Sequence, residues 1–114
     1  MAYLICPTEK VDWRIPVEEL NGFLRSRWPD VERSDSGHGQ RAHQWTFEDL
    51  HDVWVPEDRE VAWLDPNDER AAALAAHLAA AGPPNLILMD EGNNFAIELA
   101  GLDEVGILGE LHAR

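Results

Sequence analysis

The spacing of apolar residues along the chain predicts a series of short strands interrupted by helices. Short apolar runs, and runs that alternate apolar with polar side chains, are typical of strands in a sheet with one covered face. The segment 31–35 is polar and fits this pattern least well. The predicted strands cover residues 3–6, 43–48, 53–55, 61–64, 86–89 and 95–99, and the polar segment 31–35 is a weaker candidate.

The clearest helix is predicted at residues 66–81, which are rich in alanine and leucine. Asp65 is the predicted N-cap, and Pro66 suits the first helical position because its missing N–H is not needed there. Gly82 is the expected C-terminal stop. Small alanines on this helix would let it approach a sheet closely.

Two further stretches have helical spacing. Residues 16–28 place four apolar side chains on one face, with glutamates near the start and arginines near the end, where each complements the helix dipole. Residues 103–111 repeat apolar side chains at a spacing of three. Gly106 and Gly109 weaken this last prediction, because glycine in a helix costs about 1 kcal/mol relative to alanine.

Together these elements predict one α+β domain over residues 1–114, with a mainly antiparallel sheet of about five to six strands and two main helices on one face. The run 86–89 is apolar at every position, which predicts a central strand covered on both faces. The order strand, helix, strand, Asp-x-Gly turn, strand occurs over residues 3–48 and again over 61–99. This recurrence is the basis for a hypothesis of two βαββ units, followed by the C-terminal helix.

The composition is that of a globular protein. Of 114 residues, 45% are apolar and 27% are charged, and no stretch approaches the roughly 20 apolar residues that span a bilayer. Residues 1–7 have neither the basic start nor the apolar length of a signal peptide. The single cysteine, Cys6, excludes an internal disulfide. We therefore expect a cytoplasmic protein.

The charge is large and unevenly placed. A net charge of −13 argues against nucleic acid or an anionic membrane as a partner, because either would be repelled. Residues 1–47 carry seven acids and six bases, whereas residues 48–114 carry fifteen acids and three bases. Nine of those acids lie from Glu48 to Glu69. This concentration predicts an acidic surface on one part of the molecule.

Two other origins of the acidity stay open. A solvated acidic face keeps a protein soluble without any further role. Eight arginines against one lysine, with many alanines, are typical of GC-rich bacterial or haloarchaeal genes, and a high-salt host would by itself favour acidic residues.

No catalytic or cofactor motif is present. The chain lacks a nucleophile elbow, a dinucleotide-binding glycine motif and a P-loop. Cys6 stands between apolar residues and a proline, which predicts a buried, unreactive thiol. Glu98 alternates with apolar neighbours and is therefore predicted to face solvent. We therefore assign no catalytic residue and no cofactor, and we favour a non-enzymatic protein while a catalytic domain stays the alternative.

Five histidines raise the question of a metal site. None forms the His-x3-His pair that places two ligands on one face of a helix. His43 and His51 would approach each other across neighbouring strands, with nearby carboxylates as oxygen ligands. Their spacing does not match a metal-binding motif, so no metal site is predicted.

Five tryptophans are the second unusual feature. Trp28 and Trp45 share faces with apolar residues and are predicted to lie in the core. Trp54 and Trp63 point away from their apolar neighbours, so they either fill a small core or anchor an interface, where tryptophan is over-represented. Acidic residues flank Trp54. The candidate interaction surface is Glu48, Asp49, Asp52, Trp54, Glu57, Asp58 and Glu60.

Two hypotheses of function follow. The first, which we favour, is a non-enzymatic binding protein that docks a basic protein through the acidic surface around Trp54; an immunity-type inhibitor of a cationic toxin enzyme is one example. The second is a small-molecule-binding or catalytic domain, with a tryptophan-lined pocket that contains groups such as His43, His77 or Glu98. An oligomer that buries a sheet face or edge is a third hypothesis, because the sequence does not determine the oligomeric state.

Overall fold

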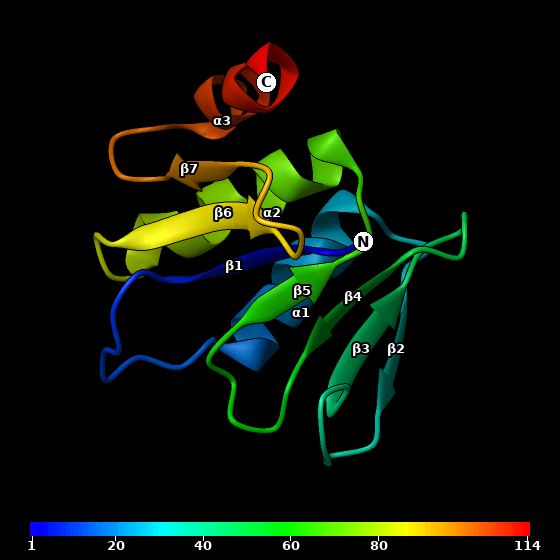
Figure 1. Cartoon of the computed structure of the whole chain (residues 1–114). Coiled ribbons are helices and arrows are strands. Elements are labelled where there is room, and N and C mark those ends of the chain that lie inside the picture. The colour runs from blue at the N-terminus through cyan, green and yellow to red at the C-terminus, as the bar shows by residue number, and fades with distance from the viewer.

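The computed structural model describes residues 1–114 without a gap and confirms the predicted α+β class (Figure 1). None of its three helices combines the length and the apolar character needed to cross a bilayer. The helices are α1 (Val17–Arg27), α2 (Asp68–Ala81) and α3 (Glu104–Ala113). The strands are β1 (Tyr3–Pro7), β2 (Glu32–Asp35), β3 (His43–Thr46), β4 (Asp52–Val55), β5 (Ala62–Leu64), β6 (Leu86–Asp90) and β7 (Ala96–Glu98).

All seven strands form one antiparallel sheet in the order β2-β3-β4-β5-β1-β6-β7. The predicted count of five to six is too low because the polar segment at β2 also pairs, along its full length, with β3. Its Arg33 faces the helices, where the guanidinium lies 5.5 Å from the Trp45 ring centroid and donates to both carboxylate oxygens of Glu18 at 2.9 Å. An arginine held in this way takes the inward position that an apolar side chain ordinarily fills.

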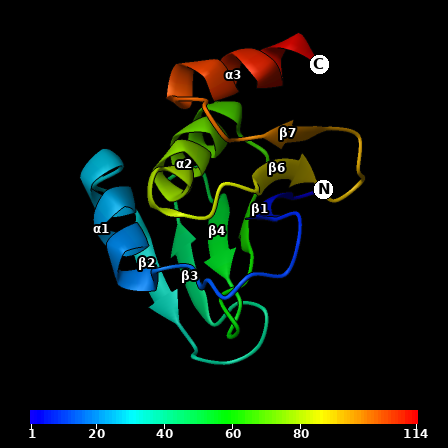
Figure 2. The ribbon, with the colours of Figure 1, turned by 90° about the vertical axis from the view of Figure 1, so that its left-hand side faces the viewer.

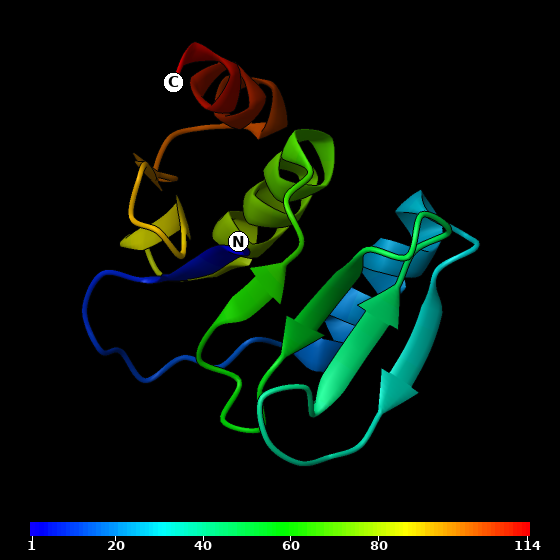
Figure 3. The same ribbon diagram turned by 45° about the vertical axis from the view of Figure 1, so that its right-hand side comes forward.

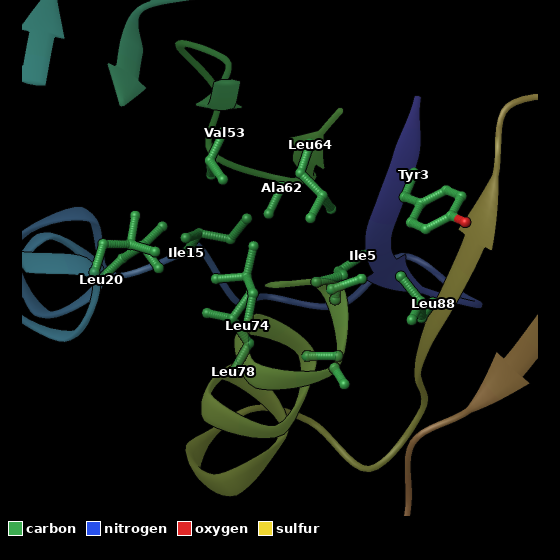
Figure 4. Packing of buried hydrophobic residues seen from close by; sticks show 14 of the residues in the cluster. Tyr3, Ile5, Ile15, Leu20, Val53, Ala62, Leu64, Leu74, Leu78 and Leu88 are labelled. Carbon is green, nitrogen blue, oxygen red and sulfur yellow. The ribbon is translucent and has the colours of Figure 1, made fainter. Parts of the chain in front are cut away.

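The helices α1 and α2 cover the same face of the sheet, as predicted, and α3 packs against α2 beyond the edge strand β7 (Figures 1 and 2). Figure 4 shows Leu74 and Leu78 of α2 pointing toward Ile5, Ala62 and Leu64 of the central strands. These five residues are at most 3% exposed. A single apolar core therefore joins this face of the sheet to both helices.

The predicted N-cap of α2 lies two residues too early. Asn67 is the cap, because its side-chain oxygen accepts a hydrogen bond from the backbone N–H of Arg70 at 3.0 Å. Asp65 instead accepts a hydrogen bond from the backbone N–H of Asp52 at 2.8 Å. The carboxylate expected to start the helix therefore ties the end of β5 to the start of β4.

The strand β6 has a neighbour on each side, but only one of its faces is covered. Leu86 and Leu88 are buried beneath the helices, whereas Ile87 and Met89 on the opposite face are only half-buried. The prediction of a strand covered on both faces is therefore wrong. Its second set of apolar side chains lies at a surface that no helix protects.

The two segments with the same order of elements sit differently in the sheet. The connection from β1 through α1 to β2 passes over three intervening strands, whereas the connection from β5 through α2 to β6 passes over only one. The hairpins β2–β3 and β6–β7 therefore lie at opposite edges, to the right and left in Figure 3. That the two segments form equivalent βαββ units stays a prediction.

Candidate functional site: the open face of the sheet

One face of the sheet carries no helix, and Figure 2 shows α1 and α2 together on the other side. Strand alternation sends every second side chain to this uncovered face. We call it the open face. Its residues include Leu4, Cys6, Glu32, Gln44, Thr46, Asp52, Trp54, Trp63, Ile87, Met89, Ala96 and Glu98.

A continuous row of apolar side chains crosses the middle of the open face. Trp54, Trp63, Leu4 and Met89 occupy successive register positions on β4, β5, β1 and β6, and all four are half-buried. The two indole rings are parallel within 5°, with centroids 6.2 Å apart. Because neighbouring strands are spaced by roughly 4.8 Å, these four residues form an apolar strip about 14 Å long. The name "apolar strip" is kept for these four residues.

Carboxylates border the apolar strip on both sides. Asp52 and Glu32 share a register row with Thr46 on one side, and Glu98 lies opposite Ile87 on the other. Glu98 is exposed, as predicted, and so is Glu32. The open face thus combines an apolar centre with an anionic border.

Arg41, in the loop between β2 and β3, lies over the end of the apolar strip. Its guanidinium carbon is 3.9 Å from the centroid of the Trp54 ring, and its Nη1 donates to Asp52 Oδ2 at 3.0 Å. The same loop touches the β4–β5 turn, where the backbone N–H of Gly39 donates to Glu57 Oε1 at 3.1 Å. The charge of Asp52 is therefore already paired in the free protein.

The predicted interaction surface is distributed over three places. Its members lie in the β3–β4 turn, on the open face itself, and in the β4–β5 turn at the opposite end of β4. Their role in binding stays a prediction. The β3–β4 turn contains Glu48 and Asp49, the open face contains Asp52 and Trp54, and the β4–β5 turn contains Glu57, Asp58 and Glu60.

The charge that is segregated in the sequence is partly mixed in space. Three arginines of the first half pair with carboxylates of the second, because the fold brings loops, helices and strands of the two halves together. Six of the eight arginines form ion pairs with carboxylates, and Arg25 and Arg59 do not. The pairs between the halves are Arg14 with Glu60, Arg27 with Glu104 and Arg41 with Asp52.

The β3–β4 turn exposes a hydrophobic side chain that the sequence analysis missed. Leu50 is 79% exposed and has a φ of +68°, a left-handed conformation that a branched residue rarely adopts. Its backbone N–H donates to the carbonyl of Phe47, which closes the turn. Nearby, a hydrogen bond with Asp30 and the like charge of that carboxylate raise the pKa of Glu48. The exposed Leu50 side chain therefore lies in the same turn as Glu48, whose carboxylate is repelled by that of Asp30.

The histidines do not assemble a metal centre. His43 Nδ1 lies 3.6 Å from Asp35 Oδ2 on the helix side of β3, whereas His51 Nδ1 lies 3.7 Å from Asp49 Oδ2 at the other end of the hairpin. No three His, Cys, Asp or Glu side chains are grouped in an arrangement that could hold a metal ion.

His77 belongs to the packing between the helices. Its ring stacks on Phe23 of α1, with centroids 4.1 Å apart and planes within 10°, and its Nε2 lies 3.7 Å from Glu19 Oε1. Burial lowers the pKa of His77, although Glu19 partly opposes the shift. The surroundings of His77 therefore disfavour its charged form.

The groups named for a small-molecule pocket do not converge. His43 faces the helices, His77 lies between α1 and α2, and Glu98 is on the open face. A hollow of about 340 Å³ does occur beside Cys6, Val61, Trp13 and Glu60, at the margin of the sheet. Cys6 is half-buried rather than fully buried as predicted, and burial raises the pKa of its thiol, so the unreactive protonated form is favoured.

The one buried acid has a structural role. Burial alone would raise the pKa of Asp90, but hydrogen bonds from Asn94 and from the backbone N–H of Phe95 lower it. The Asn94 side chain donates to Asp90 Oδ2 at 2.8 Å, which fixes the β6–β7 turn. The hydrogen bonds of the Asp90 carboxylate therefore stabilise the β6–β7 turn.

No protein-family model, no curated protein and no solved structure matches this chain. The open face is therefore interpreted from its own residues. Alternation on the strands identified Trp54 and Trp63, and the same signal applied to β1 and β6 points to Leu4 and Met89. Nothing local in the sequence identifies Arg41, because its contact with Trp54 depends on how two hairpins meet.

Proposed function

We propose that this protein is a non-enzymatic binding domain that docks a cationic partner protein on the open face of its sheet. The observation that carries the proposal is the apolar strip bordered by carboxylates on a face that no helix covers. An immunity-type inhibitor of a basic toxin enzyme in a bacterial cytoplasm is a concrete example of this class. The single thiol and the absence of a disulfide are compatible with that reducing compartment.

The composition of the open face resembles that of a protein interface. Interfaces have an apolar centre in which aromatic residues anchor the complex, surrounded by a polar rim. Trp54 and Trp63 would supply the anchors here, and Glu32 and Glu98 belong to the rim. A half-buried tryptophan pair held rigid by stacking loses little conformational freedom on binding.

Charge complementarity supports a cationic partner. A net charge of −13 attracts a basic protein from a distance and orients it before contact. The open-face carboxylates Glu32 and Glu98 lack an arginine partner within this protein. At these two residues, a basic partner would therefore gain ion pairs without first breaking existing ones.

The test is capture of a partner from the source organism at low salt, followed by variants of the purified complex. We expect a basic protein whose release increases with ionic strength, because salt screens the attraction between exposed charges. Trp63→Ala should weaken binding by about 30-fold, the loss typical of a central aromatic anchor. Glu98→Lys should slow association.

Glu110→Lys is the matched control, because it makes the same charge change on an exposed residue of α3, away from the open face. It should alter association less than Glu98→Lys does. The proposal is wrong if no basic protein is recovered at low salt, or if Trp63→Ala and Glu98→Lys bind a recovered protein as the wild type does.

A further inference from the structure

We propose that Trp54 and Asp52 form a binding site for an arginine side chain of the partner, and that Arg41 occupies this site in the free protein. The inference rests on the proposed function and names the chemical group that the open face selects. Its basis is a site whose parts are fixed by other residues and whose occupant, Arg41, bonds the carboxylate through one nitrogen only.

The site is built without help from Arg41. Stacking on Trp63 braces the Trp54 ring, and Thr46 Oγ1 donates to Asp52 Oδ1 at 2.7 Å, which leaves Asp52 Oδ2 free to accept. These contacts come from three neighbouring strands, β3, β4 and β5. An aromatic platform and a carboxylate oxygen are therefore held in fixed positions.

The geometry suits a guanidinium group. Arg41 places its planar group 3.9 Å from the Trp54 centroid while Nη1 reaches Asp52 Oδ2 at 3.0 Å. A guanidinium can stack on the ring and donate in its own plane at the same time, whereas a lysine ammonium is a strongly hydrated point charge without a flat face. The site should therefore prefer arginine to lysine.

Arg41 binds its carboxylate through fewer hydrogen bonds than Arg27 or Arg33 does. It uses a single nitrogen to bond Asp52, and its side chain is as exposed as that of Arg27. By contrast, Arg27 donates from both terminal nitrogens to the two oxygens of Glu104, at 2.9 and 2.6 Å. A partner's arginine could reproduce the contacts of Arg41 in full.

Exchange requires only a side-chain rotation. The neighbouring Ala42 is buried, and its carbonyl accepts hydrogen bonds from the backbone N–H groups of Ser36 and Gly37 at 3.1 and 3.0 Å. The base of the loop is thus closed independently of Arg41. Exposed side chains change rotamer in nanoseconds or faster, so the occupant would not slow binding.

The experiment compares an acetylated hexa-arginine amide with the hexalysine peptide of equal charge, by titration calorimetry at about 25 mM salt, where exposed charges are least screened. Arg41→Ala should raise the affinity for hexa-arginine by about fivefold, because it removes a competing intramolecular occupant. Affinity for hexalysine should rise only as far as the lost positive charge predicts.

Arg59→Ala is the matched control, because Arg59 lies in the nearby β4–β5 turn, carries the same charge and pairs with no carboxylate. It should change binding of the two peptides equally. Asp52→Asn, which keeps a hydrogen-bond acceptor for Thr46, should abolish the preference for arginine over lysine.

Equal gains from Arg41→Ala and Arg59→Ala, or equal affinity of the wild type and Arg41→Ala for the two peptides, would overturn the arginine site. In either case, docking of cations on the open face would stand. If neither peptide binds any variant at low salt, the proposed function fails together with this inference.

Discussion

Two side chains that are adjacent on β5 have opposite surroundings. Leu64 is fully buried beneath the helices, whereas Trp63 is half-buried on the open face. Both are large and apolar, so hydrophobicity does not distinguish the two faces of the sheet. The difference lies in what covers each face. The covered face meets the apolar sides of α1 and α2, while the open face keeps large, flat side chains available at the surface.

The two faces also use charge differently. On the covered side, Arg33 and Arg27 each bind a carboxylate through two nitrogens, which fixes β2 and α3 against α1. On the open face, Asp52 has a single bond to a loop arginine, and Glu32 and Glu98 have no arginine at all. The arginines on the covered side form ion pairs that stabilise the fold. On the open face, Glu32 and Glu98 remain available to pair with another molecule.

The largest expected effect is on the free energy of unfolding, and it differs between the covered face and the open face. Leu64→Ala should lower the free energy of unfolding by about 2–5 kcal/mol, because it leaves a cavity in a filled core. Leu4→Ala, on the open face of the adjacent strand, should cost about 1 kcal/mol, since its side chain is only half-buried. Urea titrations measure both. Similar losses at the two positions would mean that the open face is covered in solution, for example by a second copy of the chain.

A smaller effect of opposite sign is expected at the β3–β4 turn. Leu50→Gly should raise the free energy of unfolding by about 1 kcal/mol, because glycine adopts a positive φ without steric cost. Leu50→Ala is the control, since alanine removes the exposed side chain but keeps the strained backbone. If alanine stabilises as much as glycine does, backbone strain is not the cause. A stabilised Leu50→Gly protein that binds its partner less tightly would extend the interaction surface to this turn.

The covered side should also respond to pH in a window where the open face does not. The folded-state pKa of His77 lies below its ordinary value because of burial, so the unfolded chain binds the proton more readily. Stability should therefore be complete above about pH 7 and fall as the pH drops through about 6.5. Unfolding at pH 7.5 and 5.5 measures this loss. His77→Gln should reduce it, whereas His38→Gln, in the exposed β2–β3 loop, should leave it unchanged.

Local patterns predicted most of the elements and the direction of several side chains. Alternation placed Trp45 inward and Trp54 outward, and the alanine-rich run predicted α2 to within two residues. These properties depend on neighbours within a few residues of each other. The same kind of reasoning misplaced the N-cap, because Asp65 and Asn67 are both good caps and only the position of β4 decides between them.

The candidate site depended on information that local patterns lack. The apolar strip exists because β1 lies between β5 and β6, which places Leu4 between Trp63 and Met89. Strand order is set by contacts between distant parts of the chain. The predicted acidic surface followed the sequence along β4 and its two turns, whereas the open face extends across the strands. That is why Glu32 and Glu98 were not included in it.

The central position of β1 has a consequence for folding. This strand precedes the other six strands in the chain, yet its two neighbours end at Leu64 and Asp90, far along the chain. Strands β2 to β5 can associate through short hairpins, while β1 must wait until a long loop closes, a step that is entropically unfavourable and slow. Until then, Trp63 and Met89 are separate. The apolar strip therefore forms only when β1 is in place between β5 and β6, so a partially folded chain would not present it.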